Sequence, residues 1–440
     1  MDSEDEMLKF LGMKDIDDLF EDIPEDVRIE GINLPPGKSE MEVRNEVEGI
    51  LSKNRSLNET PCFLGGGVYN HYVPSLVDEV LSRSEFYTSY TPYQAEVSQG
   101  MLQALFEYQS LICELTGMEA ANTSMYDWST AIGEAALMAS RLTRKSEIIV
   151  PRAMHRDKHS VLANYCKGPG IRVKTFDYDK ETGRTDLDHL RNLVTEDTAG
   201  VYIENPNFFG VIEDKVDAVK SVAKDAILIV GVNPISLALL KSPGDHGADI
   251  VVGEGQLLGS YPSFGGPLLG IFACLQRHVR KMPGRVIGIT TDADGERAFC
   301  MTLQTREQHI RREKATSNIC SNESLMAVAS AVYMSLLGRS GLRRVANECI
   351  IRTRQAMGRM GSLDNFLAPA FAGEHFNEFV MKSKVSYDAV HRHLLDSGVH
   401  GGLALKSQFP ELEESAIFAF TETHSTSDID RLVWALEGVK

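Results

Sequence analysis

Hydrophobic positions in the middle of the chain predict short strands that alternate with helices. Apolar runs of strand length occur at residues 148–150, 171–176, 201–203, 227–230 and 250–252. Amphipathic helical patterns, such as that of residues 184–194, separate most of these runs. Because this alternation is typical of parallel strands joined by crossover helices, we expect an α/β fold with a mainly parallel sheet covered on both faces.

Two longer helices are predicted before the first of these strands. In residues 94–116 apolar side chains recur at helical spacing, and Gly117 follows as a C-terminal stop signal. The apolar stripe consists of Val97, Met101, Leu105, Ile112 and Leu115. An alanine-rich segment at residues 130–142 predicts the second helix.

The two ends of the chain differ from this central pattern. Residues 1–60 are acidic and punctuated by prolines, and their apolar positions are spaced as in a short pair of helices that leads into an arm. From about residue 335 onward, shorter strands and helices predict a smaller α+β unit. The predicted domains are a helical arm and linker at 1–62, a large α/β domain at 63–335 and a small α+β domain at 336–440.

The composition narrows the function classes. The net charge is −17 and the isoelectric point is about 5.2, which argues against general binding to nucleic acid or to anionic membranes. No apolar stretch approaches the ~20 residues of a membrane-spanning helix, and the acidic N-terminus is unlike a signal peptide. The seven cysteines form no CxxC motif. We therefore expect a cytoplasmic protein.

One glycine-rich segment resembles a turn that carries a reactive side chain into a pocket. The apolar run at 250–252 leads into a turn at 253–259, and the pair Gly265 and Gly266 precedes another apolar run. The layout of a large α/β domain and a smaller C-terminal domain resembles the fold type I enzymes of pyridoxal phosphate. That chemistry requires a lysine for the Schiff base, an acidic partner for the pyridine nitrogen, and amides at a helix N-terminus for the phosphate.

At the expected positions two of these requirements are absent and the third is obstructed. No lysine occurs between residues 241 and 281, and the turn offers Gln256 and Leu257 instead. The strand that should end in an acid ends near Val230, and Trp128 places an indole where the phosphate should enter. These residues mark a vacated pocket, so we expect no covalently bound cofactor on this chain.

The sequence predicts no metal site. His155 and His159 have the i, i+4 spacing of two ligands on one helix face, but no third ligand is apparent nearby.

Four longer stretches resemble the N-terminal half, or separate first subunit, of the glycine cleavage system P-protein. They are residues 86–118, 205–214, 232–256 and 303–324. The resemblance implies that two homologous halves pair like the protomers of a fold type I dimer, with the active site between them. The lysine and the pyridoxal phosphate would belong to a homologous subunit 2, and two copies of each subunit are expected.

The resemblance also implies an activity for this assembly, that of glycine decarboxylase. Glycine is expected to lose carbon dioxide at the partner-bound cofactor, and its aminomethyl group to pass to the lipoyl arm of the H-protein. The chain alone is expected to be inactive and to supply no catalytic residue. Its role would be to wall a narrow, water-poor channel, because an exposed carbanion would be protonated.

A loop before the helix at 94–116 is the first candidate for reaching the partner's site. It concentrates Tyr90, Tyr93 and Gln94 beside a proline, which fixes the backbone while the aromatic rings form rigid walls. The resemblance predicts that these residues, with His71, line the active site at the subunit interface. Ordinary packing at the start of the helix is the alternative.

A basic island in this acidic chain, at residues 306–314, leads to the second candidate. It is followed by Thr316, Ser317 and Asn318. In related fold type I dimers a threonine on a comparable loop reaches the neighbouring cofactor's phosphate, and the resemblance assigns this role to Thr316 with its two neighbours. A solvated helix face, or a docking site for an acidic H-protein, are the alternatives.

Two other functions stay open at the level of the sequence. A stand-alone pyridoxal-phosphate lyase or transaminase would need the missing lysine and acid. A non-catalytic scaffold subunit would need only the surfaces that hold the assembly together.

Overall fold

The structure is a computed structural model that describes residues 3–29 and 31–439. It divides into two compact units, Met1–Ser56 and Leu57–Lys440. The first unit contains the helices α1 (Ser3–Leu11) and α2 (Glu40–Leu51) and the short 3-10 helices η1 (Ile16–Phe20) and η2 (Glu25–Val27). None of its described residues is buried. The second helix of the predicted pair is thus a 3-10 helix, which begins at a capping box on Asp15.

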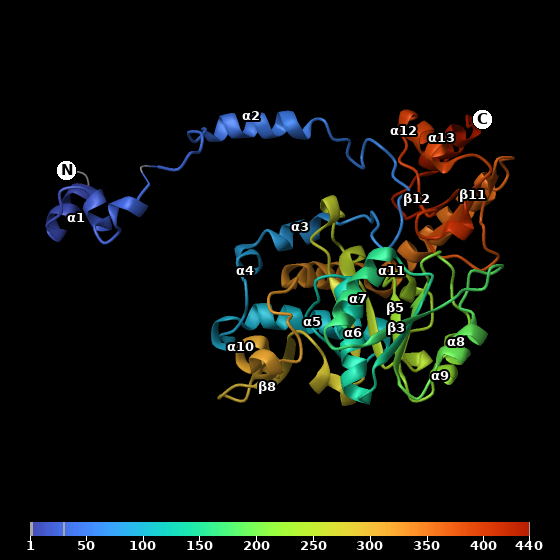
Figure 1. Cartoon of the computed structure of the whole chain (residues 1–440), viewed down its shortest axis with the longest axis horizontal. Helices are drawn as coiled ribbons and strands as arrows, with labels where there is room; N and C mark the ends of the chain where they lie inside the picture. The colour runs from blue at the N-terminus through green and yellow to red at the C-terminus, as the bar shows by residue number, and fades with distance from the viewer. Residues whose placement is uncertain (1–2, 30, 440) are drawn as a thin grey trace. The chain divides into compact units, whose positions relative to one another are not determined.

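The second unit is built on a seven-stranded sheet with the order β1-β7-β6-β5-β4-β2-β3. Strands β2 to β6 pair in parallel, whereas β7 runs antiparallel to β6 and to the short β1. The mainly parallel sheet predicted from the apolar runs is therefore confirmed (Figure 1). The strands are β1 (Ala120–Ala121), β2 (Glu147–Pro151), β3 (Arg172–Phe176), β4 (Thr198–Asn205), β5 (Ile227–Val232), β6 (Ile250–Glu254) and β7 (Gly270–Cys274).

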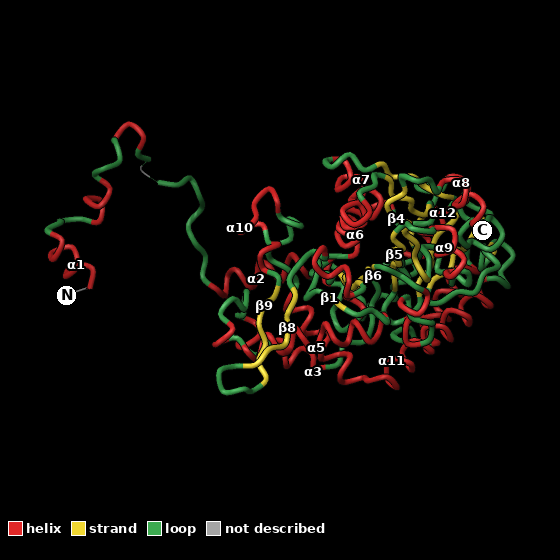
Figure 2. The backbone as a smooth tube through the Cα atoms, turned by 90° about the horizontal axis from the view of Figure 1, so that it is seen from below, coloured by secondary structure: helices red, strands yellow, loops and turns green. Residues whose placement is uncertain are grey.

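Helices cover both faces of this sheet. Helices α6 (Trp128–Thr143) and α7 (Arg156–Lys167) lie on one face, and α5 (Gln99–Thr116), α3 (Ser75–Leu81) and α11 (Ser324–Met360) lie on the other (Figure 2). The strand side chains alternate between the two layers, as the period of two requires. Along β5, for example, Leu228 and Val230 join the α5 layer, and Ile229 joins the α6 layer.

The remaining helices of the second unit are short. The α-helices are α4 (Ser84–Tyr87), α8 (Leu187–Leu193), α9 (Val216–Ala223) and α10 (Gln308–Arg311). The 3-10 helices are η3 (Ala95–Val97), η4 (Ser236–Ala238), η5 (Gly244–His246), η6 (Gly255–Leu257), η7 (Ser263–Gly265), η8 (Gln276–Lys281), η9 (Gln304–Arg306), η10 (Arg312–Lys314) and η11 (Pro410–Leu412).

A smaller antiparallel sheet forms the C-terminal part, with the order β10-β11-β13-β12. Its elements are β10 (Phe366–Leu367), β11 (Glu378–Ser383), α12 (Tyr387–Asp396), β12 (Leu403–Ala404), β13 (Ser415–Ala419) and α13 (Thr426–Glu437). Helix α13 begins at a capping box formed by Ser425 and Asp428. A separate hairpin, β8 (Val286–Thr291) and β9 (Arg297–Thr302), lies beside α5.

Helix α11 connects the two sheets. Its first half packs in the α5 layer and its end, at Ala356 and Met360, packs in the core of the small sheet. The predicted boundary between 335 and 336 falls inside this helix, close to a break at Gly338, where φ is 57° and ψ is −172°.

Helix α11 also bears on the membrane question. By length and composition it is the one helix of the described chain that could cross a membrane, so the prediction that no apolar stretch approaches that length is wrong. Residues such as Ala327, Val328 and Tyr333 nevertheless lie in the core against α5 and α3. The core helix of a water-soluble protein passes the same test, so this single helix is weak evidence for a span.

Candidate functional site

The predicted vacated pocket lies where β5 and β6 end and α6 begins. Trp128 is the first residue of α6, and Gln256 lies in η6, directly after β6. One carboxylate joins them. Glu254, at the end of β6, accepts hydrogen bonds from the backbone N–H groups of Trp128 (3.2 Å), Gln256 (3.0 Å) and Leu269 (2.8 Å).

The N-terminus of α6 is the place where this arrangement of strands and helices could hold a phosphate. Here it is occupied by the chain's own acids. Asp127 caps the helix by accepting from the N–H of Thr130 at 2.7 Å, and Glu254 accepts from the N–H of Trp128. Burial raises the pKa of Glu254 to about 7. A phosphate at this terminus would face two carboxyl groups instead of free amides.

A buried ion pair fills the space beside Trp128. The Lys158 ammonium, from α7, lies 3.1 Å from the centroid of the Trp128 ring and 2.9 Å from a carboxylate oxygen of Glu204 on β4. The Tyr202 hydroxyl donates to the same oxygen at 2.8 Å. Burial lowers the pKa of Lys158, and the neighbouring Glu204 carboxylate opposes that change.

The strand beneath the Trp128 indole has a glycine at the point of contact. Gly231 on β5 faces Trp128, and a Cβ at this position would lie 2.9 Å from the indole and 2.3 Å from the Tyr202 hydroxyl. Val230, predicted to mark the vacated acid position, points into the α5 layer instead. Leu257 also packs in that layer. The structure therefore places Trp128 in the pocket but not Val230, because a one-residue step along a strand changes the face. Gln256 contacts the pocket through Tyr69 and does not line it.

The residues of this pocket do not fit pyridoxal phosphate. The cavity between Trp128, Lys158, Glu204 and Glu378 has a volume of about 20 Å³, whereas a cofactor site needs roughly 300 Å³ or more. Gln256, in the turn where the lysine was expected from the sequence, cannot form a Schiff base. Lys158 is held between an indole and a carboxylate in a space for about one water molecule.

The predicted interface loop is held by an arginine that sequence reasoning did not identify. Arg285, just before β8, donates to the Thr91 hydroxyl at 3.2 Å and to the Tyr93 hydroxyl at 3.1 Å, and its guanidinium lies 5.3 Å from the Tyr93 ring centroid. Tyr90, Tyr93 and Gln94 are all exposed. Nothing in the spacing around Arg285 indicates this role, since its partners lie far away in the sequence.

The second predicted segment lies against the same loop. The Tyr90 hydroxyl is hydrogen-bonded to the Ser321 hydroxyl, and the Tyr93 ring packs edge-on against His309 with centroids 6.2 Å apart. Arg285 lies 3.7 Å from the carboxylate of Glu307. The two candidate segments predicted separately from the sequence thus form one continuous surface.

The three residues predicted to contact a phosphate differ in their surroundings. The Ser317 hydroxyl donates to the buried carboxylate of Glu134 at 2.7 Å. Thr316 is half-buried and Asn318 is exposed, and among the described residues their side chains have no hydrogen-bond partner. Only Thr316 and Asn318 therefore present free polar groups.

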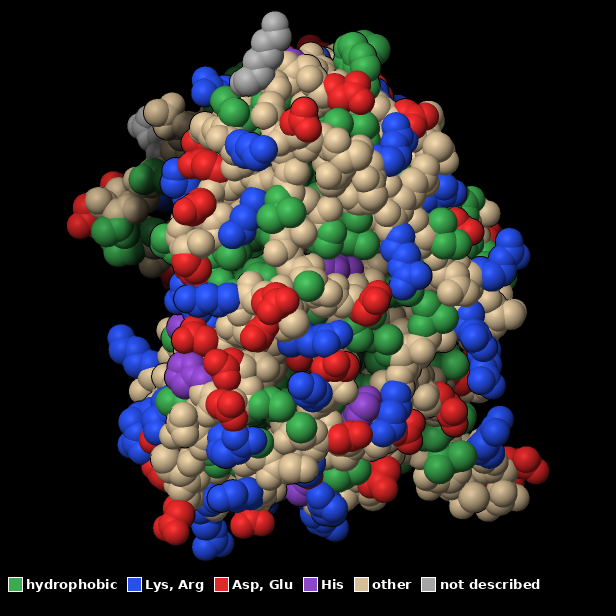
Figure 3. Space-filling view, turned by 90° about the vertical axis from the view of Figure 1, so that its right-hand side faces the viewer, with side chains coloured by type: hydrophobic (Ala, Val, Ile, Leu, Met, Phe, Trp, Pro, Cys, Tyr) green, Lys and Arg blue, Asp and Glu red, His purple; other side chains and the backbone are tan. Residues whose placement is uncertain are grey.

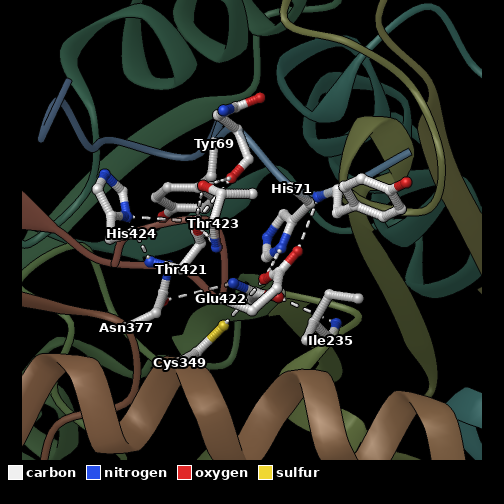
Figure 4. A network of polar contacts seen from close by, with 12 residues as sticks. Tyr69, His71, Ile235, Cys349, Asn377, Thr421, Glu422, Thr423 and His424 are labelled. Carbon is white, nitrogen blue, oxygen red and sulfur yellow. Dashed lines mark hydrogen bonds and ion pairs between the residues drawn. The ribbon is translucent and has the colours of Figure 1, made fainter. Parts of the chain in front are cut away.

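His71 lies apart from these segments. It is buried, and its Nδ1 lies 2.8 Å from a carboxylate oxygen of Glu422 (Figure 4). The other oxygen of Glu422 accepts from the N–H of Tyr72 at 2.8 Å, and the Cys349 thiol lies 3.7 Å from the first oxygen. His71, Cys349 and Glu422 form a group of metal-ligand type in the described chain, but their hydrogen bonds to one another already satisfy the carboxylate.

One of the two histidines with i, i+4 spacing has a structural role. His155 caps α7, because its Nδ1 accepts from the N–H of Asp157 at 3.2 Å, and burial lowers its pKa. On the molecular face drawn in Figure 3, acidic and basic side chains are interspersed. That distribution differs from the basic stripe typical of a nucleic-acid-binding surface.

Comparisons with known proteins bear on these features. Residues 1–436 match the family described as "Glycine cleavage system P-protein". The chain is 49% identical over 439 residues to a protein of Thermococcus onnurineus named "Probable glycine dehydrogenase (decarboxylating) subunit 1". The match covers 99% of this chain and 97% of that protein.

Solved structures give the same assignment. A crystal structure of glycine decarboxylase (P-protein) of the glycine cleavage system, in inhibitor-bound form, matches with a TM-score of 0.92 and 39% identity, over 99% of this chain and 98% of that one. A sphingosine-1-phosphate lyase of Burkholderia pseudomallei matches in fold alone, with a TM-score of 0.61 and 15% identity over 94% of each chain. The predicted fold, that of the type I pyridoxal-phosphate enzymes, is confirmed. The chain belongs to the glycine cleavage system P-protein family.

Proposed function

We propose that this chain is the subunit of glycine dehydrogenase (decarboxylating) that lacks the cofactor-binding lysine. A homologous second subunit would supply that lysine and hold the pyridoxal phosphate. The observation that carries this proposal is the closed pocket. Gln256 lies in the turn where the lysine was expected, Lys158 is paired with Glu204, and about 20 Å³ of space is left.

The substrate and the acceptor of the complex follow from the family. Bound pyridoxal phosphate supplies an electron sink for the loss of carbon dioxide from glycine. The aminomethyl group would then pass to the lipoyl arm of the H-protein. This chain contributes no amine and no general acid or base to that step in our proposal.

The exposed loop around Tyr90 and Tyr93 would wall the partner's site. Arg285 fixes the loop by two hydrogen bonds and a stacked guanidinium, so the two rings are presented in a defined position. Rigid aromatic walls exclude water from the reacting carbon, which prevents its premature protonation.

The segment beside that loop would contact the cofactor's phosphate across the interface. Thr316 and Asn318 support this role because their polar groups are free, whereas Ser317 is engaged by Glu134. We therefore assign the direct contact to Thr316 and a supporting role to Asn318. Ser317 would act by fixing the backbone between them, since its hydroxyl also accepts from the N–H of Ile319 at 3.1 Å.

We propose that the working assembly contains two copies of each subunit and acts in the cytoplasm. The support for the location is that the relative named above comes from a prokaryote. A scaffold role is the second candidate, and it is favoured because Lys158 in the vacated pocket is paired with Glu204.

The test is reconstitution with the lysine-bearing homologue. The chain purified without added cofactor and then treated with borohydride should carry no reduced pyridoxal phosphate, and the two chains together should exchange labelled carbon dioxide into glycine. Cofactor trapped on the isolated chain would overturn the proposal. Replacing Tyr93 by Phe and by Ala distinguishes the scaffold role from the wall role. If the chain is only a scaffold, both variants should assemble with the second subunit and keep full turnover.

A further inference from the structure

Gln256, in the turn where the lysine was expected, has a different task. Its side-chain oxygen accepts from the backbone N–H of Tyr69 at 3.3 Å, and its amide nitrogen donates to the carbonyl of Tyr69 at 3.1 Å. The same nitrogen donates to the carbonyl of Ser260 at 2.6 Å. The side chain is fully buried. One amide therefore holds two separate loops, residues 65–74 and residues 258–268.

The first of these loops has no regular structure, so side chains satisfy its backbone groups. The N–H of Gly66 donates to Glu378 at 2.6 Å, the carbonyl of Asn70 accepts from Thr421 at 2.7 Å, and the N–H of Tyr72 donates to Glu422 at 2.8 Å. Figure 4 shows Thr421 and Glu422 converging on this loop. Fixing a loop costs conformational entropy, so this many dedicated contacts indicate that the position of the loop backbone matters.

Both loops carry exposed aromatic side chains. Tyr72 is 68% exposed, Tyr261 is 46% exposed and Phe264 is 97% exposed. Tyr261 is itself oriented, because its hydroxyl donates to Asp78 at 2.8 Å. Rigidly held aromatic residues on a surface are characteristic of the core of protein–protein interfaces.

We propose that Gln256 is a positioning residue that presents Tyr72 and Tyr261 to the lysine-bearing subunit. The inference rests on the proposed function, in which that subunit faces this one across the active site. The chemistry of the position supports the assignment. A lysine has only donors and could not accept from Tyr69, whereas an amide offers the acceptor and the two donors that the two loops require.

The second subunit is the occupant that the surface fits. Tyr69, which Gln256 holds, lines the vacated pocket. The chain also belongs to a family in which a relative is named as one subunit of a decarboxylase. An ammonium or phosphate ligand would need a charged group here, and none of the exposed residues of the two loops, residues 65–74 and 258–268, is charged. A flat aromatic surface on the partner would pack against the exposed aromatic rings of these loops.

The test compares Gln256→Met with a matched control, Gln109→Met. Gln109 is also buried and also exchanges two hydrogen bonds with one backbone residue, Ile287, at 3.0 and 2.8 Å. Both variants should melt at a lower temperature than the wild-type chain. Only Gln256→Met should weaken binding of the second subunit, by about tenfold. Equal binding constants for the two variants would overturn the inference.

A double-mutant cycle separates positioning from general loss of structure. If Gln256 acts through Tyr72, then Tyr72→Ala should weaken subunit binding by a similar factor, and the double variant should be little worse than either single one. Full additivity would overturn the inference. If Gln256→Met does not fold, Tyr72→Ala and Tyr261→Ala decide the matter, because unchanged binding in both surface variants also overturns it.

The complex of the two wild-type subunits distinguishes a failure of the proposed function from a failure of the present inference. If the wild-type complex assembles but neither decarboxylates glycine nor exchanges carbon dioxide, the proposed function fails. If the wild-type complex is active and Gln256→Met binds the second subunit normally, only the present inference fails.

Discussion

Lys158 shows how a vacated site is kept closed. A buried ammonium is costly unless it is paired, and here a carboxylate and the face of an indole share it. The pair occupies the space beside Trp128 in the vacated pocket. Trp128, Lys158 and Glu204 should therefore behave as one unit in stability measurements.

Replacing Lys158 by Met should be strongly destabilising. The change leaves the Glu204 carboxylate buried with only the Tyr202 hydroxyl as a donor, and such a loss typically costs about 4 kcal/mol. Urea unfolding of the isolated chain measures it. The double variant Lys158→Met/Glu204→Gln should recover part of the loss. The exposed pair of Arg83 and Glu85 is the control, and Arg83→Met should leave the unfolding free energy unchanged.

The pH dependence of stability should depend on Glu378. Burial raises its folded pKa to about 7 from an ordinary 4.5. A raised carboxyl pKa contributes stability that is present below pH 4.5 and is lost as the pH rises through 7, which corresponds to about 3 kcal/mol. Glu378→Gln keeps an acceptor for the N–H of Gly66 and should remove this loss.

The measurement is the difference between the unfolding free energies of Glu378→Gln and wild type at several pH values. The unfolding free energy of the variant should rise relative to that of the wild type between pH 5 and pH 8. A difference that is constant with pH would contradict the assignment, because a change in packing alone does not titrate.

At the level of single residues, the sequence predicts absences better than partnerships. The apolar runs indicate where each strand ends. The absence of a lysine after β6 and the large side chain of Trp128 could therefore be identified from the sequence. Lys158 and Arg285 could not be identified, because their meaning depends on partners that lie 46 and about 190 residues away. Val230 was wrongly assigned to the pocket, because the end of an apolar run does not show on which face of the sheet a side chain lies.

At the level of elements, the sequence predicts what local rules determine. The alternation of apolar runs and amphipathic helices gave the parallel strands, Gly117 with φ of 68° ends α5, and the capping box begins α13. The β8–β9 hairpin was not predicted, because its exposed outer residues weaken the apolar signal. The continuation of α11 through residue 335 also escaped prediction, since tertiary packing on both sheets supports it.

The break in α11 provides a test of backbone strain. Gly338 has φ of 57° and ψ of −172°, a region that side-chain-bearing residues rarely adopt, although no atom lies within 4 Å of a built Cβ. Gly338→Ala should therefore cost about 1–3 kcal/mol through backbone strain alone. Thermal unfolding measures this loss.

A matched control lies in the same helix. Gly358 also has open space around a built Cβ and has ordinary helical geometry, so Gly358→Ala should leave stability unchanged or raise it by about 0.4–1 kcal/mol. If both variants behave alike, the break at Gly338 carries no strain and α11 can straighten there.

At the scale of the whole molecule, the two units differ in how they bury apolar surface. The second unit has layered cores on both faces of its main sheet. The first unit has no buried described residue, and it exposes apolar side chains throughout its helices, including Phe10, Ile16, Phe20 and Val47. Such exposure is unusual for a segment that acts alone and is typical of one that binds another surface.

We therefore expect residues 1–56 to be ordered by the second subunit. In the isolated chain, a protease should cleave this segment rapidly and leave residues 57–440 intact, because the two segments form separate compact units. Removing residues 1–56 should leave the melting temperature of the rest unchanged but weaken subunit binding by at least about tenfold. Protection of the segment in the isolated chain, or full binding after its removal, would show that its apolar face is satisfied without a partner.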